Sequence, residues 1–274
     1  IFAINPCAEL SIPFNVIEGY VVLMFILFVG GTILDMVHKK SAKYFFEKCE
    51  KAKADRERVL GSGETVGIAI QTVAADVMTS AEFCNPVRRV AHLFTMYGFI
   101  LFIVSTMALV FAYTGKDAPA IVSQLWHLGA VMVMLGGYAF WFFIRVDVSA
   151  EGLSWFRFER ADLFIVSLLA TSTFALAWSF TGGGLTIIFA LFILSSTVLF
   201  GGVYFSKFAH MFFKPAAAHQ KKMTIADGSR ENLPVDFDLT DPAVQKAFPD
   251  IPQYMGEKPE YMGHGIRREK PNHY

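Results

Sequence analysis

The sequence predicts an all-α integral membrane protein: a five-transmembrane-helix bundle with its N-terminus outside and an extended cytoplasmic C-terminal tail. Three observations lead to this prediction. The 274 residues are 54% hydrophobic and 18% charged, with a mean hydropathy of +0.44, which is too apolar for a water-soluble domain of this length. Five stretches are long and apolar enough to cross a bilayer, and the basic residues gather in alternate loops.

The five spans each hold about 20 or more residues with few charges, which suffices for a helix to cross a hydrocarbon core about 30 Å thick. They cover residues 17–37, 91–114, 122–144, 163–181 and 185–210. Glu18 and Asp35 lie near the two ends of the first span, where a carboxylate can reach the interface. The turn Thr181-Gly182-Gly183-Gly184 predicts a tight hairpin between the last two spans.

The positions of lysine and arginine predict the orientation. Residues 38–90 contain ten of them, whereas the loop 115–121 contains only Lys116 and the turn 181–184 contains none. We therefore expect loop 38–90 in the cytoplasm. The next loop and the C-terminal region carry further basic residues on the same side: Arg145, Arg157, Arg160, Lys214, Lys221 and Lys222. With five crossings, the N-terminus is then outside.

The chain is expected to have three parts. They are an external N-terminal segment (1–16), a five-helix membrane domain (17–215) with the cytoplasmic loop 38–90, and an extended cytoplasmic tail (216–274). Residues 1–16 lack the basic region and cleavage site of a signal peptide. The tail is rich in proline and shows no periodicity, which leaves two alternatives: a solvated, disordered segment, or an arm that becomes ordered against a cytoplasmic partner.

Two short helices are expected within the cytoplasmic loop. Residues 39–58 form a charged, amphipathic continuation of the first helix, and residues 65–83 form a second short helix. Gly61-Ser62-Gly63 separates them as a linker.

Composition excludes several classes of function. The 24 basic and 24 acidic residues balance, which argues against a nucleic-acid-binding protein. The cysteines Cys7, Cys49 and Cys84 are too few and too scattered to hold an iron–sulfur cluster or a closed zinc site. The sequence has no nucleotide-binding loop, nucleophile elbow or zinc-protease motif, so no catalytic residue is assigned.

Two histidines are the candidate metal ligands. His92 lies near the inner end of the second span and His210 at the inner end of the fifth, and because these spans run in opposite directions the two residues reach the same depth. A heme between two neutral imidazoles has both axial positions filled, and therefore carries electrons instead of binding oxygen. The alternative is that both are interfacial residues whose polar tips reach water.

Neighbouring residues suit a heme. Arg88, Arg89 and Lys207 lie at the water boundary beside the two histidines, where they can neutralise the propionates. Gly98 lies about two turns from His92 and would let a flat macrocycle approach the backbone. The 28 phenylalanines would keep the pocket dry.

The other histidines have weaker assignments. His38 ends the first span and is expected to be a juxtamembrane cation or, with Tyr97, to contact a quinone head group. His127 lies near the outer end of the third span without a histidine at its depth, so no second heme is expected there. The tail histidines are expected to be solvated: His219, His264 and His273.

Two runs of residues resemble a known family. Residues 88–99 (RRVAHLFTMYGF) and 205–215 (FSKFAHMFFKP) are similar to the second and fifth helices of the nitrate reductase gamma-subunit-like membrane cytochromes b. That family includes membrane subunits of heterodisulfide reductase and of quinone-interacting oxidoreductases, and five helices with the N-terminus outside is its layout. Members with two hemes carry two further histidines, at the positions where this chain has Phe102 and Phe192. The resemblance thus implies one heme b on the cytoplasmic side, held by His92 and His210.

The resemblance also implies a function. Members of this family pass electrons between membrane quinone and a cytoplasmic enzyme, through iron–sulfur or flavin subunits that partner chains supply. The short, cluster-free form is similar to the adenylylsulfate reductase-associated membrane proteins of sulfur metabolism, in the cytoplasmic membrane of bacteria or archaea. Such a chain is an electron-transfer subunit without catalysis of its own. The alternative is a heme-free anchor for a soluble enzyme, whereas a transporter lacks the expected broken-helix pairs.

Overall fold

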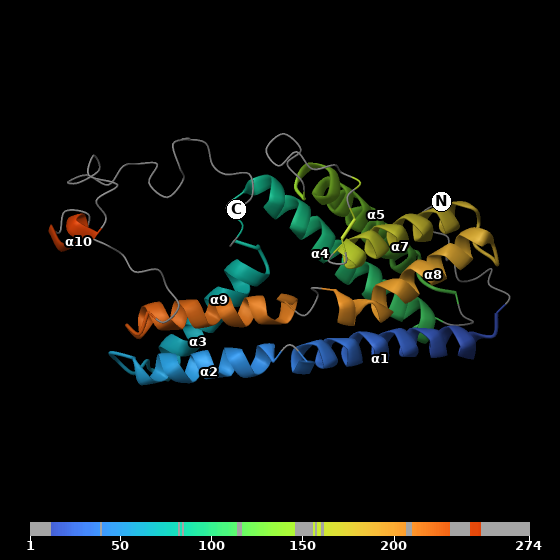
Figure 1. The fold of residues 1–274 in the computed structure, drawn as a ribbon. Coiled ribbons are helices and arrows are strands. Elements are labelled where there is room, and N and C mark those ends of the chain that lie inside the picture. The colour runs from blue at the N-terminus through green and yellow to red at the C-terminus, as the bar shows by residue number, and fades with distance from the viewer. Residues whose placement is uncertain are drawn as a thin grey trace.

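The computed structural model describes residues 12–38, 40–81, 83, 85–113, 117–145, 156, 158–159, 162–206, 210–230 and 242–247. These residues form helices and connecting turns, and none of them lies in a strand (Figure 1). Four helices are long and apolar enough to cross a membrane: α1 (Phe14–His38), α4 (Pro86–Met107) with its π-helical extension η2 (Ala108–Ala112), α5 (Ala120–Phe143) and α7 (Leu163–Phe180). The predicted all-α, multi-span membrane fold is confirmed at this level.

The fifth predicted span is not a single helix. Helix α8 (Ile187–Gly201) is apolar but has only 15 residues, and a 3-10 turn, η4 (Val203–Phe205), follows it. The chain is extended at Ser206, and a separate helix, α9 (His210–Ala226), begins at His210. The prediction of one helix over 185–210 is therefore wrong. The pair Gly201-Gly202 explains the break, because glycine is a poor helix former.

Glycines set the packing of the bundle. Helices α4 and α5 form its closest pair, because three glycines let the two backbones touch. A Cβ on Gly129 would lie 2.5 Å from the Phe102 amide nitrogen, and one on Gly136 would lie 2.7 Å from the Ala91 carbonyl oxygen. Helices α7 and α8 are joined by the predicted hairpin, in which residues 182–184 all have the positive φ that favours glycine.

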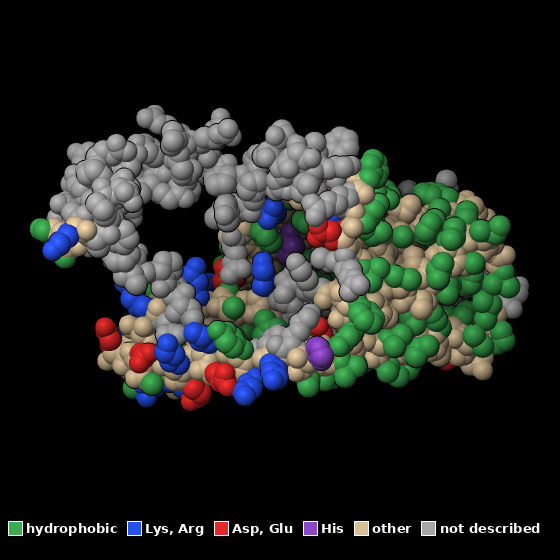
Figure 2. Space-filling view, in the orientation of Figure 1, with side chains coloured by type: hydrophobic (Ala, Val, Ile, Leu, Met, Phe, Trp, Pro, Cys, Tyr) green, Lys and Arg blue, Asp and Glu red, His purple; other side chains and the backbone are tan. Residues whose placement is uncertain are grey.

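Tryptophans fill the centre of the bundle and hydrophobic side chains cover its outside. Trp126 on α5 and Trp178 on α7 are nearly inaccessible and pack with Phe102, Ala130 and Ala175. Helix α1 lies against α8 and η4, and exposes most of its apolar side chains. Figure 2 shows hydrophobic side chains over this half of the molecule, as expected of a surface that faces lipid.

Charged residues gather on a second group of helices at one end of the bundle (Figure 2). We call this group the helical cap: α2 (Ser41–Ala54), α3 (Ser62–Gln71), the π-helical η1 (Thr72–Val77) and α9. The backbone turns at Lys40, whose φ is 53°, so α2 starts as a new helix beyond α1. Each of the two predicted stretches of loop 38–90 is helical, but the bounds differ. Helix α2 is separate from α1, and the second stretch begins at Ser62, inside the predicted linker, and ends at Val77.

Contacts hold α9 against the rest of the cap. Lys222 Nζ lies 2.5 Å from Asp76 Oδ2 on η1, and the backbone amides of Glu57 and Arg58 donate to the Asp227 carbonyl oxygen. The hydrogen bonds that Arg58 donates to the Glu64 carboxylate raise the pKa of the Arg58 guanidinium. Loop 38–90 and the segment after the fifth span therefore lie at the same end of the bundle.

The start of the tail is folded. Residues 216–226 continue α9, so the expectation of an extended chain from residue 216 does not hold for them. This helix shows little periodicity in the sequence, because Pro215 and an Ala–His–Gln–Lys run interrupt the apolar pattern. A further short helix, α10 (Pro242–Ala247), is described in the tail.

Candidate functional site

The candidate site lies where the cap meets the bundle, around His92 on α4. Asn85 starts this helix by accepting hydrogen bonds from the backbone amides of Val87 and Arg88, and Pro86 occupies the first turn. His92 follows close to the beginning of the helix, and its side chain is exposed. The His92 Nδ1 atom lies 3.0 Å from the hydroxyl oxygen of Ser80, which is a hydrogen-bonding distance. An α4 histidine is thus oriented by a residue that precedes the helix.

Residues 78–81 and Phe83 form a turn between η1 and α4, which we call the 78–83 turn. Side chains of α4 bind it twice more. The Arg89 Nε donates to the Thr79 carbonyl oxygen at 2.6 Å, and the Tyr97 hydroxyl donates to the Met78 carbonyl oxygen at 2.7 Å. The turn is therefore held onto the face of α4 that carries His92.

Phe83 of this turn connects His92 to helix α9. Its ring centroid lies 4.9 Å from that of the His92 imidazole, and the Lys214 Nζ lies 5.2 Å from the Phe83 ring centroid. Lys214 comes one helical turn after His210, and positions four apart share a face of a helix. The beginning of α9 and the His92 region of α4 thus contact the same ring. The side chain of His210, and all of Lys207, lie outside the described residues.

Arg88 is the predicted propionate partner that the structure leaves unsatisfied. Its Nε atom is buried and has no hydrogen-bond partner within the part of the chain that the structure describes. A buried guanidinium nitrogen without an acceptor is costly, and a carboxylate is the acceptor that matches it best. Arg89 differs, because its Nε already donates to the Thr79 carbonyl oxygen.

Gly98 does not have the predicted role. A Cβ at this position would lie 2.6 Å from the Met132 Cβ and 2.8 Å from the Val133 amide nitrogen, both on α5. The expectation that Gly98 makes room for a macrocycle therefore does not hold, because helix α5 occupies that room. The glycine serves helix packing instead.

The proposed quinone contacts are not brought together by any described contact. The His38 ring packs edge-on against the Tyr204 ring of η4, with centroids 6.2 Å apart. The Tyr97 hydroxyl donates to the 78–83 turn, as described above. Each of these residues therefore has a structural partner of its own.

Two other histidines are explained by their surroundings. His127 is 1% exposed, and its nitrogens lie 2.6 Å from the Ser123 carbonyl oxygen and 2.5 Å from the Ser179 hydroxyl oxygen of α7. It joins α5 to α7. His219 lies on α9 with its Nε2 atom buried, so the expectation that it is solvated does not hold.

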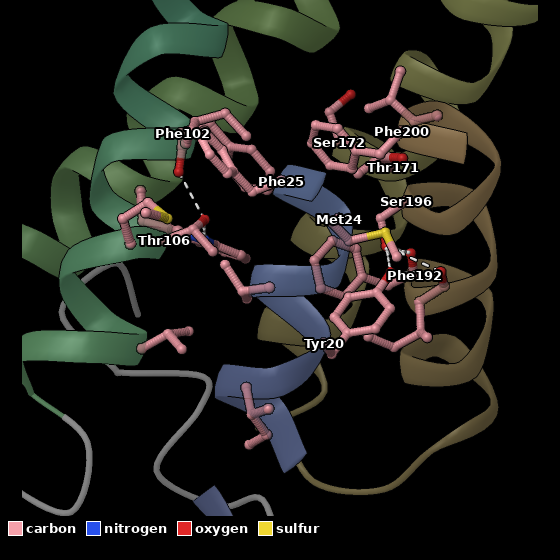
Figure 3. Close-up of a pocket in the computed structure, with 18 of the residues that line it drawn as sticks. Tyr20, Met24, Phe25, Phe102, Thr106, Thr171, Ser172, Phe192, Ser196 and Phe200 are labelled. Atoms are coloured by element: carbon pink, nitrogen blue, oxygen red, sulfur yellow. Dashed lines mark hydrogen bonds between the residues drawn. The ribbon is translucent and has the colours of Figure 1, made fainter. Parts of the chain in front are cut away.

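Phe102 and Phe192, at the positions where the resemblance places the ligands of a second heme, line one apolar cavity of about 380 Å³ (Figure 3). Tyr20 of α1 enters the same cavity and its hydroxyl lies 2.7 Å from the Ser196 hydroxyl oxygen. Sequence alone does not single out Tyr20, because its partner is 176 residues away and an interfacial tyrosine is common near the end of a span.

Among the described residues, no group of three or more His, Cys, Asp or Glu side chains is arranged to hold a metal ion. A heme needs only two axial ligands, so the pair His92 and His210 would hold it without such a group. The described residues fit the cofactor at three points: a hydrogen-bonded imidazole, an aromatic ring beside it, and a buried guanidinium nitrogen for which they offer no acceptor.

Comparisons of the chain with known proteins identify no relative. No family model, no curated protein and no solved structure matches it.

Proposed function

We propose that this chain is the membrane cytochrome b subunit of a quinone-linked oxidoreductase, and that it holds one heme b between His92 and His210. One observation carries the proposal: the Phe83 ring contacts His92 on one side and Lys214, in the first turns of α9, on the other. This contact supports a common site between α4 and α9. In the sequence, only the matched depth of His92 and His210 pointed to such a site.

Each residue of the site has a defined part in this proposal. His92 and His210 would hold the heme iron, and the heme would supply one-electron chemistry. The Arg88 Nε, which is buried and has no acceptor among the described residues, would pair with a propionate. The Phe83 ring packs against one side of the exposed His92 imidazole and would add an apolar contact beside the heme. Lys207 and Arg89 contribute positive charge near the propionates.

The wider proposal follows from the resemblance. Helix α8 and η4 complete a fifth crossing, the N-terminus is outside, and the helical cap lies in the cytoplasm of a bacterial or archaeal cell. Electrons then pass between membrane quinone, with His38 and Tyr97 as candidate contacts, and the iron–sulfur or flavin subunits of a cytoplasmic enzyme. Adenylylsulfate reductase is the candidate enzyme, and the cap with its tail is the candidate binding surface for it.

A reduced-minus-oxidised difference spectrum of the full chain, purified with its partner subunits, tests the proposal. We expect the sharp bands of a bis-histidine heme and a heme-to-protein ratio of about one. His92→Ala and His210→Ala should each remove the signal. The matched control is His219→Ala, on the same helix as His210, which should retain it. A colourless wild-type protein contradicts the proposal, as does a His210→Ala variant that keeps its heme.

A heme-free membrane anchor is the second candidate. The replacement of both outer ligand positions by Phe102 and Phe192 favours it, as does the break in the fifth span before His210. In that case a colourless preparation still retains the soluble enzyme, and deletion of residues 231–274 releases it.

A further inference from the structure

Ser80 has an unusual backbone conformation for a serine. Its φ is 50°, and within the described residues only Lys40 and Arg230 are other non-glycine residues with positive φ. Its side chain is also buried, at 3% exposure. Glycine adopts this conformation without steric cost, whereas serine does not. The serine hydroxyl must therefore contribute something that glycine cannot supply.

The hydroxyl of Ser80 contacts His92. The Ser80 Oγ lies 3.0 Å from the His92 Nδ1 atom, across the interface between the 78–83 turn and α4. The two residues before Ser80 fix the turn in place, because the carbonyl oxygens of Thr79 and Met78 accept hydrogen bonds from α4 side chains. The Ser80 carbonyl oxygen is held as well, since it accepts a hydrogen bond from the Phe83 amide at 3.1 Å. Ser80 is thus a rigidly held partner for one nitrogen of the imidazole.

We propose that Ser80 is the positioning residue for His92 as a heme ligand; this rests on the proposed function. A neutral imidazole has one N–H donor and one acceptor nitrogen. When the Ser80 oxygen accepts a hydrogen bond from Nδ1–H, the lone pair lies on Nε2, and Nε2 becomes the ligating atom. Histidine ligands commonly donate their second N–H in this way, which fixes the ring orientation and makes the ligand more basic.

Two consequences follow for the bound heme. The hydrogen bond limits rotation of the His92 ring, which the Phe83 ring also restricts from one side. A more basic ligand stabilises the oxidised iron, so the hydrogen bond lowers the midpoint potential. Removal of the hydroxyl should therefore weaken heme binding and raise the potential.

The test uses Ser80→Gly in the full chain with its partner subunits. This variant removes the hydroxyl and at the same time relieves the backbone at φ 50°, so a loss of folding is not expected. We expect heme dissociation to become about tenfold faster, the midpoint potential to rise, and the low-spin electron paramagnetic resonance signal to shift. Ser80→Ala, which keeps the backbone cost, should change the potential in the same direction.

The matched control is Thr79→Ala. The Thr79 hydroxyl belongs to the same turn, but it donates to the Ala75 carbonyl oxygen at 2.7 Å and its loss leaves the Arg89 contact to the Thr79 backbone intact. This variant should leave the potential and the resonance signal unchanged.

The outcomes separate this inference from the proposed function. A wild-type protein without heme overturns both. A wild-type protein with heme, together with Ser80→Gly spectra, potential and dissociation rate equal to the wild type, overturns the role of Ser80 alone. Equal shifts in Ser80→Gly and Thr79→Ala also overturn it, because the effect then comes from the turn as a whole.

Discussion

Neighbouring residues of one type have different environments at this site. The sequence predicts the same role for Arg88 and Arg89, which is to neutralise the heme propionates, because both lie at the water boundary beside His92. The structure separates them: Arg89 donates to the Thr79 carbonyl oxygen, whereas the Arg88 Nε is buried and meets no acceptor in the described part of the chain. The difference depends on how the 78–83 turn folds back onto α4. Sequence spacing cannot show this, because the turn has no periodicity of its own.

The ion pair of Arg145 with Asp162 gives a prediction at the same scale. Both side chains are 13% exposed, the Arg145 Nε lies 2.9 Å from Asp162 Oδ1, and the guanidinium stacks over Trp141. Arg145→Ala leaves a partly buried carboxylate without its partner and should lower the free energy of unfolding by about 3 kcal/mol. Denaturation of the detergent-solubilised protein measures this.

The control is Lys53→Ala. Its pair with Glu50 is solvent-exposed, so its removal should change the free energy of unfolding by less than about 0.5 kcal/mol. Equal losses in the two variants would contradict the assigned importance of the Arg145 pair.

At the scale of helices, hydropathy predicted where the apolar segments lie better than where they end. The stretch 185–210 is apolar enough to read as one helix, but Gly201-Gly202 and the extended Ser206 divide it. His210 was therefore placed at the end of a span, whereas it begins α9. The glycine pair is visible in the sequence, but the sequence does not show that the helix ends there. Glycine is frequent inside membrane helices, so its presence alone does not predict a break.

The glycine contact between α4 and α5 gives a prediction at this scale. Gly129→Ala would place a Cβ 2.5 Å from the backbone of Phe102, so one helix has to move. We expect a loss of about 1–3 kcal/mol in the free energy of unfolding, the usual cost of overpacking. The matched control is Gly30→Ala on α1, where a Cβ meets no atom within 4 Å. A control variant that is destabilised as much as Gly129→Ala would contradict this explanation.

For the whole molecule, the sequence predicted separate polar segments, and the structure joins them. Loop 38–90 and residues 210–227 are expected on one side of the membrane, and the sequence predicts no particular contact between them. Their contacts join atoms that are far apart along the chain. The Asp227 carbonyl oxygen meets the amides of Glu57 and Arg58, and the Lys222 ammonium meets Asp76. Charge counting predicts the side of a loop, but it cannot predict which carboxylate a given lysine meets.

The Lys222–Asp76 ion pair predicts how firmly α9 is held in the cap. The two side chains are 27% and 12% exposed. Lys222→Glu places two carboxylates together. We expect hydrogen exchange in α9 to become about tenfold faster, which corresponds to a loss of about 1.4 kcal/mol in the free energy of local opening. The charge swap with Asp76→Lys should restore most of the protection.

Reversal of the exposed Lys43–Glu47 pair on α2 serves as the control and should leave exchange in α9 unchanged. If the Lys222→Glu variant exchanges like the wild type, this ion pair does not hold α9 in the cap.

Helix α8 has a consequence for the lipid around it. At a rise of 1.5 Å per residue, its 15 residues span about 22 Å, whereas an average hydrocarbon core is about 30 Å thick. Its exposed large hydrophobic side chains are Ile187, Leu191, Leu194 and Val198. In the proposed fifth crossing, the membrane beside α8 would thin, which creates a hydrophobic mismatch on one flank only. Lipids with short acyl chains should collect there, and thick, sterol-like bilayers should exclude the protein.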